Sequence, residues 1–346
     1  KNEPFFFHMN FVDAHTPLTD QAAGLPEEPL GPDDVAPWPW LGGDHPTVRK
    51  RVAGYYNCVK RVDIGVGLVL QELEKRDLTQ NTLVIFVGDH GPPFCRGKTT
   101  CYESGLAVPM IVRWPAQISP GQVHPELVST VDLLPTFCEA GGAPIPPGAA
   151  GASMLPLMVS DSGTQSWRQT ILAEWTTHGP LNYYPMRSIR DRRYKLIHNL
   201  VAGERENPTK GVDGCPAARI ILSDEVREPE METAYRRWHN PPEFELYDLL
   251  TDPSELHNLA DNPTYKPVLE RLTGELRTWQ RRTNDPLRDP AELQKLTAFH
   301  DQLREQIGKR RAAARKKAEA EGRKMTRRER HQAMRFEPDY TVPRGN

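Results

Sequence analysis

The sequence predicts an α/β fold in which a mixed, mostly parallel sheet is flanked by helices. The first observation is an apolar, β-branched run at residues 82–88 that stops abruptly at Asp89-His90-Gly91. The second is a long amphipathic helix pattern just before that run. Buried strands that alternate with helices are typical of parallel sheets. We also expect a smaller C-terminal α+β subdomain and a basic helical tail.

The first element is an apolar segment at residues 5–11, which we expect to form a strand. It ends in polar residues, Asp13-Ala14-His15. His8 lies inside the segment, and we expect it to be a packed core histidine. His15, in contrast, follows the strand and is a candidate site residue.

The next elements are a helix at residues 47–78 and the strand that ends at Asp89. Apolar side chains recur at three- and four-residue steps along the helix, which places them on one face. Residues 108–114 read as a second buried strand. A further helix is expected at residues 130–140, where Gly141-Gly142 ends it.

Composition is that of a globular protein with a basic end. At 346 residues, one large domain plus a smaller one is expected. The net charge of -2 gives no reason to expect specific nucleic-acid binding. Residues 304–335 carry thirteen Lys or Arg against four Glu, and we expect a solvated helix or partial disorder there. Docking of this tail on an anionic polysaccharide, membrane or nucleic acid is a weaker alternative.

Five cysteines are too few for a disulfide framework. Cys95 and Cys101 could bridge around the loop that holds Lys98, and free thiols are the alternative. No apolar run reaches the length of about 18 residues that a membrane span needs.

The candidate functional residues lie at the polar ends of the two expected strands. If both strands belong to one sheet, Asp89-His90 and His15 lie at the same edge, where ligands bind in α/β proteins. Asp89 could then hold a metal ion, and Lys98 a short loop away could contact an anion bound to that metal. The alternative is an ordinary strand end with a polar turn.

These residues resemble a known family. Asp89-His90-Gly91 with Lys98, His15 after a strand, and residues 245–260 together resemble the sulfatases of the alkaline phosphatase superfamily. Residues 184–190 and 194–200 are similar to the heparan N-sulfatase (N-sulfoglucosamine sulfohydrolase) branch. The resemblance covers about residues 1–285 and implies an alkaline-phosphatase-like fold.

The resemblance implies a role for each residue at the sheet edge. Asp89 and His90 correspond to metal ligands, and Ca²⁺ is the expected ion, with Mn²⁺ or Zn²⁺ as alternatives because imidazole suits them better. His90 could instead only hydrogen-bond to a ligand, and the heparan N-sulfatase pattern has Asn there. Lys98 and His15 correspond to catalytic residues, with Lys98 contacting the sulfate and His15 gripping it and donating a proton to the leaving group.

His178 and Arg187 are the expected substrate contacts. His178 lies in a loop that resembles the substrate-facing part of the heparan N-sulfatase branch. Arg187 is the weaker candidate, because an arginine in a strand is usually the partner in a structural ion pair. We expect Glu103 to have a structural role near the Lys98 loop.

The family's nucleophile motif is missing from these residues. Sulfatases open with a strand bearing paired aspartates and a Cys/Ser-x-Pro-x-Arg motif whose first residue becomes formylglycine, and neither occurs here. The similar stretch Cys215-Pro-Ala-Ala-Arg219 has its proline one position early, so Cys215 reads as a loop cysteine. We expect formylglycine to lie in an absent N-terminal segment, and the chain by itself to be inactive.

Several expectations follow for the whole protein. The function would be hydrolysis of a sulfate ester or sulfamate on a sulfated carbohydrate, with phosphonate or phosphate monoester hydrolysis as the chemical alternative. A non-catalytic carbohydrate-binding remnant is the alternative from another class. Residues 1–160 would be part of the catalytic domain, 161–288 the C-terminal subdomain and 289–346 the tail. Family analogy suggests an extracellular, periplasmic or lysosomal location, and a homodimer stays open.

Overall fold

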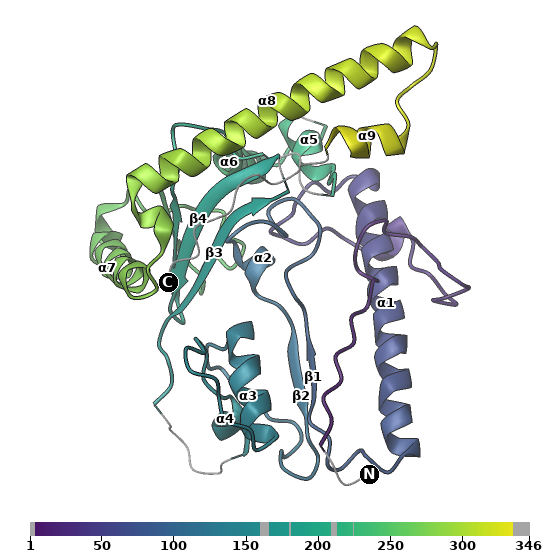
Figure 1. Cartoon of the computed structure of the whole chain (residues 1–346), viewed down its shortest axis with the longest axis vertical. Helices are drawn as coiled ribbons and strands as arrows, with labels where there is room; N and C mark the ends of the chain where they lie inside the picture. The colour runs from purple at the N-terminus through teal and green to yellow at the C-terminus, as the bar shows by residue number, and fades with distance from the viewer. Residues whose placement is uncertain (1–3, 160–165, 180, 209–212, 224, 335–346) are drawn as a thin grey trace.

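The computed structural model describes residues 4–159, 166–179, 181–208, 213–223 and 225–334. Two separate sheets and a set of helices make up this part of the chain (Figure 1). The strands are β1 Val84–Val87, β2 Met110–Arg113, β3 Ile171–His178, β4 Asn182–Arg190, β5 Tyr194–Asn199 and β6 Phe244–Asp248. The α-helices are α1 Pro46–Lys75, α2 Glu103–Leu106, α3 Leu133–Ala140, α4 Leu155–Val159, α5 Ala217–Leu222, α6 Pro229–His239, α7 Lys266–Arg282, α8 Pro290–Ala320 and α9 Arg327–Ala333. Short 3-10 helices lie at Pro32–Asp34, Thr130–Asp132, Pro263–Tyr265 and Pro286–Arg288.

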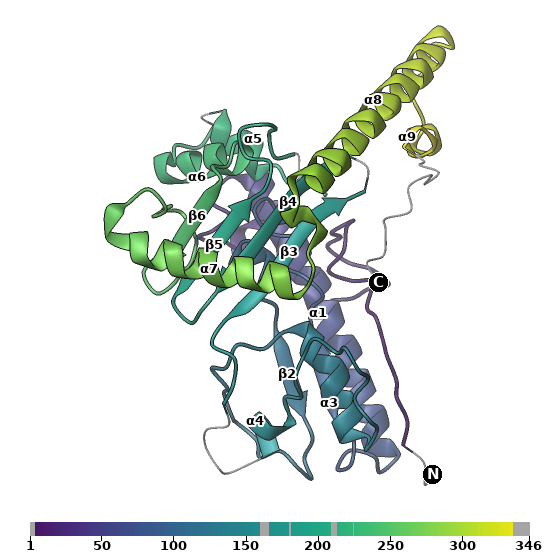
Figure 2. The same cartoon turned by 60° about the vertical axis from the view of Figure 1, so that its left-hand side comes forward.

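The helix expected at residues 47–78 is confirmed as α1. Pro46 occupies the first turn, where its missing N–H costs nothing, and the His45 ring accepts a hydrogen bond from Thr47 N at 3.1 Å. The first half of α1 is buried, with Val48 and Val52 fully covered. The second half is largely exposed, and α1 extends beside β1 and β2 in both views (Figures 1 and 2).

The strand before Asp89 is confirmed as β1, and the strand expected at residues 108–114 is confirmed as β2. They pair antiparallel, with Val84 opposite Arg113 and Val87 opposite Met110. Residues of α3, α4 and the loops around them cover one face of this pair, and Met154, Leu155 and Met158 are the buried residues there. The outer face is open, and Ile111 is 63% exposed.

All strand pairs within the described residues are antiparallel, so the mostly parallel pairing that we expected does not occur there. The apolar run at residues 82–88 predicts a strand, but the side chains of β1 are only half-buried. Apolar content therefore identified the strand correctly without determining the direction of its partner, which depends on the route of the chain between strands.

The prediction of a strand at residues 5–11 is wrong. This segment has no strand geometry, and Phe5, Phe6 and Phe7 are 59%, 71% and 69% exposed. It extends beside α1 (Figure 1), and the Phe6 ring lies 5.4 Å from the ring of Phe137 on α3. It pairs with no described strand, and an apolar run without backbone partners does not form a sheet. His8 is exposed, so it is not the core histidine that we expected.

The second sheet is an antiparallel meander in the order β3-β4-β5-β6. One face packs against α7, and its buried residues are Ile189, Leu196, Leu246, Leu272 and Leu276. The opposite face belongs to the largest core, which joins the first half of α1, the loop around Cys95, and helices α5 and α6. The sheet therefore lies between α7 and these other elements, and it connects the Lys98 loop to the C-terminal part of the chain (Figure 2).

The described part of the basic tail, up to residue 334, is mostly helical. Asp289 caps α8 by accepting a hydrogen bond from Ala291 N at 2.9 Å. The start of α8 is fixed by Thr297, which hydrogen-bonds to Tyr183 on β4 at 2.9 Å, and by His300, whose ring stacks on the same tyrosine. The rest of α8 projects away from the sheet, and α9 folds back against it (Figure 2). Within the described residues, α8 and every other helix fall short of the length or apolarity that a membrane span requires.

Candidate functional site

The Asp89-His90 pair follows β1 directly and is open to solvent. Gly88 N still donates to Pro109 O at 3.2 Å, which is the last backbone bond toward β2. Asp89 then turns outward with its side chain 88% exposed. Its Oδ1 accepts from His90 N at 2.9 Å, and its Oδ2 lies 3.5 Å from His90 Nε2. The strand therefore presents a carboxylate and an imidazole side by side.

Gly91 fixes this pair against α2. Its N–H donates to Gly105 O at 2.9 Å. A Cβ on Gly91 would lie 1.8 Å from Ser104 O, so no other residue fits without moving the turn. The close approach of two backbones sets the position of Asp89-His90.

Lys98 is buried and faces a carboxylate that sequence reasoning missed. Its Nζ lies 3.6 Å from Asp213 Oδ2, and the two side chains are 8% and 9% exposed. Asp213 Oδ1 accepts from Thr16 Oγ1 at 2.9 Å, and its carbonyl accepts from Arg51 at 2.8 Å. Asp213 therefore joins the Lys98 loop to the segment that carries His15.

His178 lies at the end of β3, and several charged groups influence its pKa. Burial lowers the pKa of His178 first, and the positive charge of Lys98 lowers it further. His90 and His15 act in the same direction, and the negative charge of Asp213 opposes them. These four groups are therefore the charges that act on His178.

We call His15, His90, Lys98, His178 and Asp213 the cationic cluster. It is assembled from four parts of the chain: the segment after residues 5–11, the β1–α2 connection, the end of β3 and the loop before α5. Three of the groups can carry positive charge through an imidazole and one through an ammonium. Such a group is suited to bind an anion and to exchange a proton with it.

Arg187 does not join the cationic cluster. It lies in β4, is 2% exposed, and donates to both carboxylate oxygens of Asp285 at 2.9 Å. Glu174 lies 3.4 Å away on the neighbouring strand. Burial lowers the pKa of the Arg187 guanidinium, but the hydrogen bond and charge of Asp285 outweigh this and raise it. These contacts favour the structural ion pair over the substrate contact, which remains a prediction.

Glu103 holds α2 in place, as expected. Its carboxylate pairs with Arg190 and lies 3.0 Å from Lys195 Nζ. Lys195 is fully buried and also lies 3.1 Å from Glu255. Glu255 Oε2 in turn accepts from Glu103 N at 2.6 Å. This network joins α2, and with it Gly91 and Asp89-His90, to the second sheet.

The residues of the cluster region offer only part of a metal site. Within the described residues, no three His, Cys, Asp or Glu side chains are placed to hold an ion together. Asp89 and His90 provide one carboxylate and one imidazole, whereas Ca²⁺ takes six to eight oxygen ligands. A complete site would need donors beyond these two.

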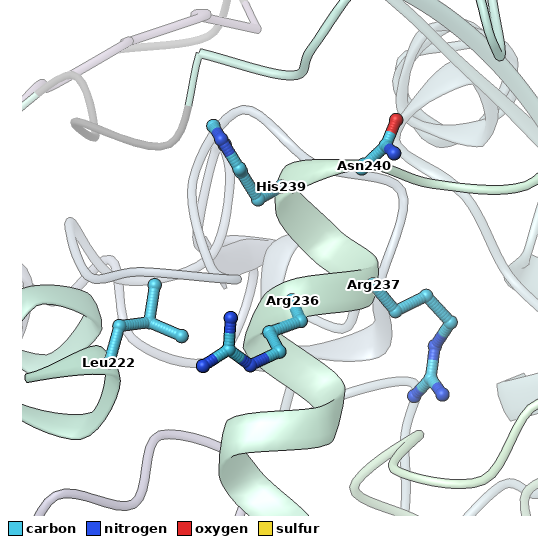
Figure 3. Close-up of a pocket in the computed structure, with 5 residues that line it drawn as sticks. All are labelled: Leu222, Arg236, Arg237, His239 and Asn240. Atoms are coloured by element: carbon cyan, nitrogen blue, oxygen red, sulfur yellow. The ribbon is translucent and has the colours of Figure 1, made fainter. Parts of the chain in front are cut away.

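A separate pocket of about 460 Å³ lies between α5 and the end of α6 (Figure 3). Leu222, Arg236, Arg237, His239 and Asn240 line it. Arg236 is already paired with Glu232, and Arg237 donates to Leu256 O at 2.6 Å. None of the lining residues belongs to the cationic cluster, so this pocket is distinct from the candidate site.

Comparison with protein families supports the sulfatase resemblance. The family model described as Sulfatase matches residues 1–143, and the one described as N-sulphoglucosamine sulphohydrolase, C-terminal, matches residues 88–206. An ulvan-active sulfatase of Formosa agariphila is 35% identical over 70% of this chain and 45% of its own length. The human N-sulphoglucosamine sulphohydrolase is 33% identical over 72% of this chain and 51% of its own length.

A solved structure has the same fold. The protein BT4656, in complex with its substrate D-glucosamine-2-N,6-O-disulfate, superposes with a TM-score of 0.53 at 24% identity. The match covers 69% of this chain and 42% of that one. The α/β, alkaline-phosphatase-like fold class is thereby confirmed. The chain spans about half the length of the curated relatives that it matches.

Family members generally use a metal ion and formylglycine. Both family models match ranges that include Asp89-His90-Gly91, and both relatives are sulfohydrolases or sulfatases by name. The chain therefore belongs to the sulfatase family.

Proposed function

We propose that the protein hydrolyses a sulfate ester or sulfamate on a sulfated carbohydrate. The observation that carries the proposal is the cationic cluster, in which Lys98 pairs with Asp213 and the charges of Lys98, Asp213, His90 and His15 act on His178. A sulfate group needs this kind of surrounding, because its oxygens must be neutralised while the leaving group is protonated. A sulfated sugar is the substrate named for one relative by fold.

Lys98 is the proposed sulfate contact. Asp213 balances its charge at 3.6 Å, which is longer than a hydrogen bond, and Asp213 Oδ2 has no hydrogen-bond donor. The pair is therefore loose, and a bound sulfate could compete for the ammonium. Asp213 would keep Lys98 oriented in the absence of substrate.

The histidines are the proposed proton carriers and substrate contacts. The lowered pKa of His178 keeps its ring neutral near pH 7, so that it can accept a hydrogen bond from a sugar hydroxyl or donate one to it. His15 is the exposed member of the cluster that follows residues 5–11, and it is the proposed donor to the leaving group.

Two further groups complete the proposal. We propose that Asp89 and His90 contribute to a Ca²⁺ site whose other ligands lie outside the described cluster, with Mn²⁺ or Zn²⁺ as alternatives. No Cys/Ser-x-Pro-x-Arg motif occurs in the 346 residues, so the formylglycine would come from sequence beyond them. An extracellular, periplasmic or lysosomal location and the three domain ranges 1–160, 161–288 and 289–346 are part of the same proposal.

The test compares the product of the whole gene with the 346-residue chain. Each is assayed on N-sulfated glucosamine, a fluorogenic aryl sulfate and an aryl phosphonate, with and without added Ca²⁺. We expect turnover of the sulfated substrates by the whole product only, and a loss of about 10²- to 10³-fold in kcat/KM for Lys98→Met. Lys75→Met, at the exposed end of α1, is the control and should be neutral.

Other outcomes have definite meanings. Faster turnover of the phosphonate would replace the sulfatase assignment by the phosphonate hydrolase alternative. Binding of N-sulfated glucosamine without turnover of any substrate would favour the carbohydrate-binding remnant. Calcium-dependent turnover by the 346-residue chain alone would contradict the proposed origin of the nucleophile.

A further inference from the structure

Two cysteines from distant parts of the chain meet beside the cationic cluster. Cys95 lies in the loop that leads to Lys98, and Cys215 follows Asp213. Cys95 Sγ donates to the Cys215 carbonyl oxygen at 3.5 Å, and each thiol influences the pKa of the other. Both are free thiols in the structure. The Cys95–Cys101 bridge considered from the sequence is therefore not formed, and the neighbour of Cys95 is Cys215.

The surroundings make the two thiols chemically different. Burial raises the pKa of Cys95 well above its usual value, and Cys95 is 1% exposed. Burial by itself would also raise the pKa of Cys215, but the Cys95 thiol and the N–H groups of Cys95 and Ala217 point at its sulfur and lower the pKa to about 7. Cys215 is also the less buried of the two. It is therefore the thiol that ionises first and reacts first.

We infer that Cys95 and Cys215 form a disulfide when the protein meets a small-molecule disulfide such as oxidised glutathione. The Cys215 thiolate attacks one sulfur of the oxidant, which forms a mixed disulfide and releases one glutathione thiolate. Cys95 then loses its proton and attacks the Cys215 sulfur, which releases the second glutathione. The protein gives up two electrons and two protons, and one oxidised glutathione becomes two reduced molecules.

The disulfide would connect the two segments that hold Lys98 and Asp213. Lys98 follows Cys95 by three residues, and Asp213 precedes Cys215 by two. The contact between these segments now consists of the Lys98–Asp213 pair, weak contacts of the thiols and an Arg51 side chain that donates to both Pro93 O and Asp213 O. A covalent bond would hold the cluster together whether or not an anion is bound.

Competing pairings are disfavoured by burial. Cys101 is fully buried, and burial raises its pKa to about 11, so it reacts slowly with an external disulfide. It contacts Ser188 on β4 and faces Lys195. It therefore belongs to the charge network around α2 and lies away from the Cys215 segment.

The main experiment maps the bond by mass. The 346-residue chain is incubated with oxidised glutathione, alkylated, and digested with trypsin without reduction. We expect peptides 77–96 and 211–219 to be joined, and peptide 99–113, which holds Cys101, to be alkylated. The number of thiols that react after denaturation should fall from five to three. A join between 77–96 and 99–113, a mixed disulfide that stays on Cys215, or five remaining thiols would overturn the inference.

A second measurement tests the effect on stability and uses variants. The oxidised protein should unfold at a temperature higher than the reduced protein by on the order of 5 °C, because the bond closes a long loop. Cys215→Ser should lose this shift and leave Cys95 as a thiol, whereas Cys138→Ser, a part-buried cysteine elsewhere, should keep it. An equal shift in Cys215→Ser would show that the stabilisation arises from another pair. If Cys215→Ser does not fold, the peptide map of the wild-type protein still shows whether Cys95 and Cys215 form a disulfide.

Discussion

At the scale of single residues, the positive charge of Lys98 in the candidate site is balanced by the carboxylate of Asp213. Lys98 and Asp213 are both nearly buried, and a buried charge is tolerated only with a partner. The charges of both residues, together with those of His90 and His15, influence the pKa of His178. The ionisation of His178 is therefore a direct reporter of whether the cationic cluster exists in solution.

The first prediction concerns this ionisation. His178 should titrate below 6.5 in an NMR titration of its ring proton. Lys98→Met should raise the pKa of His178 because it removes a positive charge, and Asp213→Asn should lower it because it removes a negative one. His198, whose pKa is lowered mainly by burial and is otherwise set by Glu243, Arg277 and Arg187, should be unaffected. Shifts of the same sign in the two variants, or none, would show that the groups are apart.

The sign of the pH effect on stability follows from the same shift. A histidine whose pKa is lower when folded binds its proton less well than in the unfolded chain. His178 and His198 both have lowered pKa values, and burial is the largest cause for each. Their contribution to stability is complete above about 6.5 and is lost as the pH falls toward the lowered values. Urea titrations of the wild type and of His198→Gln at pH 7.5 and 5.5 should show a smaller loss in the variant.

The second prediction separates two roles for Arg187. If its pair with Asp285 is structural, Arg187→Met should reduce the free energy of unfolding by about 3–5 kcal/mol, since it leaves a buried carboxylate without its charged partner. Arg281→Met, at an exposed position of α7, should cost less than about 0.5 kcal/mol. Urea denaturation measures both. Unchanged stability with a raised KM would instead make Arg187 a substrate contact.

At the scale of elements, close backbone contacts position the turn that carries Asp89-His90. Gly91 touches Ser104 of α2, and α2 is held by the network of Glu103, Lys195 and Glu255. The turn is therefore supported from the second sheet, although its residues follow β1 of the first. A change in this support should move the Asp-His pair without touching it.

The third prediction compares two glycines. Gly91→Ala should lower the free energy of unfolding by about 1–3 kcal/mol, because its Cβ would overlap the Ser104 carbonyl. Gly67→Ala is the matched control: Gly67 lies within α1, where a Cβ meets no atom within 4 Å. There alanine should stabilise the protein by about 0.5–1 kcal/mol. A neutral Gly91→Ala in the same denaturation experiment would contradict the tight packing of α2 on the turn.

At the scale of the whole molecule, apolar side chains are exposed around the first sheet. Phe5, Phe6 and Phe7, the middle of α1 at Ile64 and Leu68, and Ile111 on β2 are all more than one-third exposed. Phe11 of the same N-terminal segment lies against Gly65 of α1. Exposed apolar side chains gathered in one region are unusual for a soluble surface and bind other apolar groups.

The fourth prediction follows from this surface. The 346-residue chain should bind the dye ANS, and Phe7→Ser with Ile111→Thr should reduce the fluorescence by about half while the unfolding midpoint stays the same. Val123→Thr, at a side chain that is 91% exposed in a loop, is the control and should change little. Undiminished fluorescence in the double variant would mean that the dye binds elsewhere.

The sequence by itself determined the elements whose signals are local and the residues attached to them. The period of α1, the apolar runs of β1 and β2, and the position of Asp89-His90 after a strand end all depend on neighbouring residues, so they could be read correctly. Lys98 could be predicted near Asp89 because few residues separate the two in the chain. The family resemblance identified His15 and His178 as candidate site residues.

The tertiary structure alone decided what depends on contacts between distant residues. Asp213 and Cys215 lie in a loop with no periodic pattern, and their meeting with Lys98 and Cys95 results from the packing of α5 and α6 against the Lys98 loop. The antiparallel pairing of the strands and the exposure of residues 4–11 also depend on contacts between distant residues. Hydrogen-bond partners and burial are properties of the assembled chain, so local sequence does not determine them. Sequence patterns describe what a segment can do, and only its neighbours in space determine which of those possibilities has the lowest free energy.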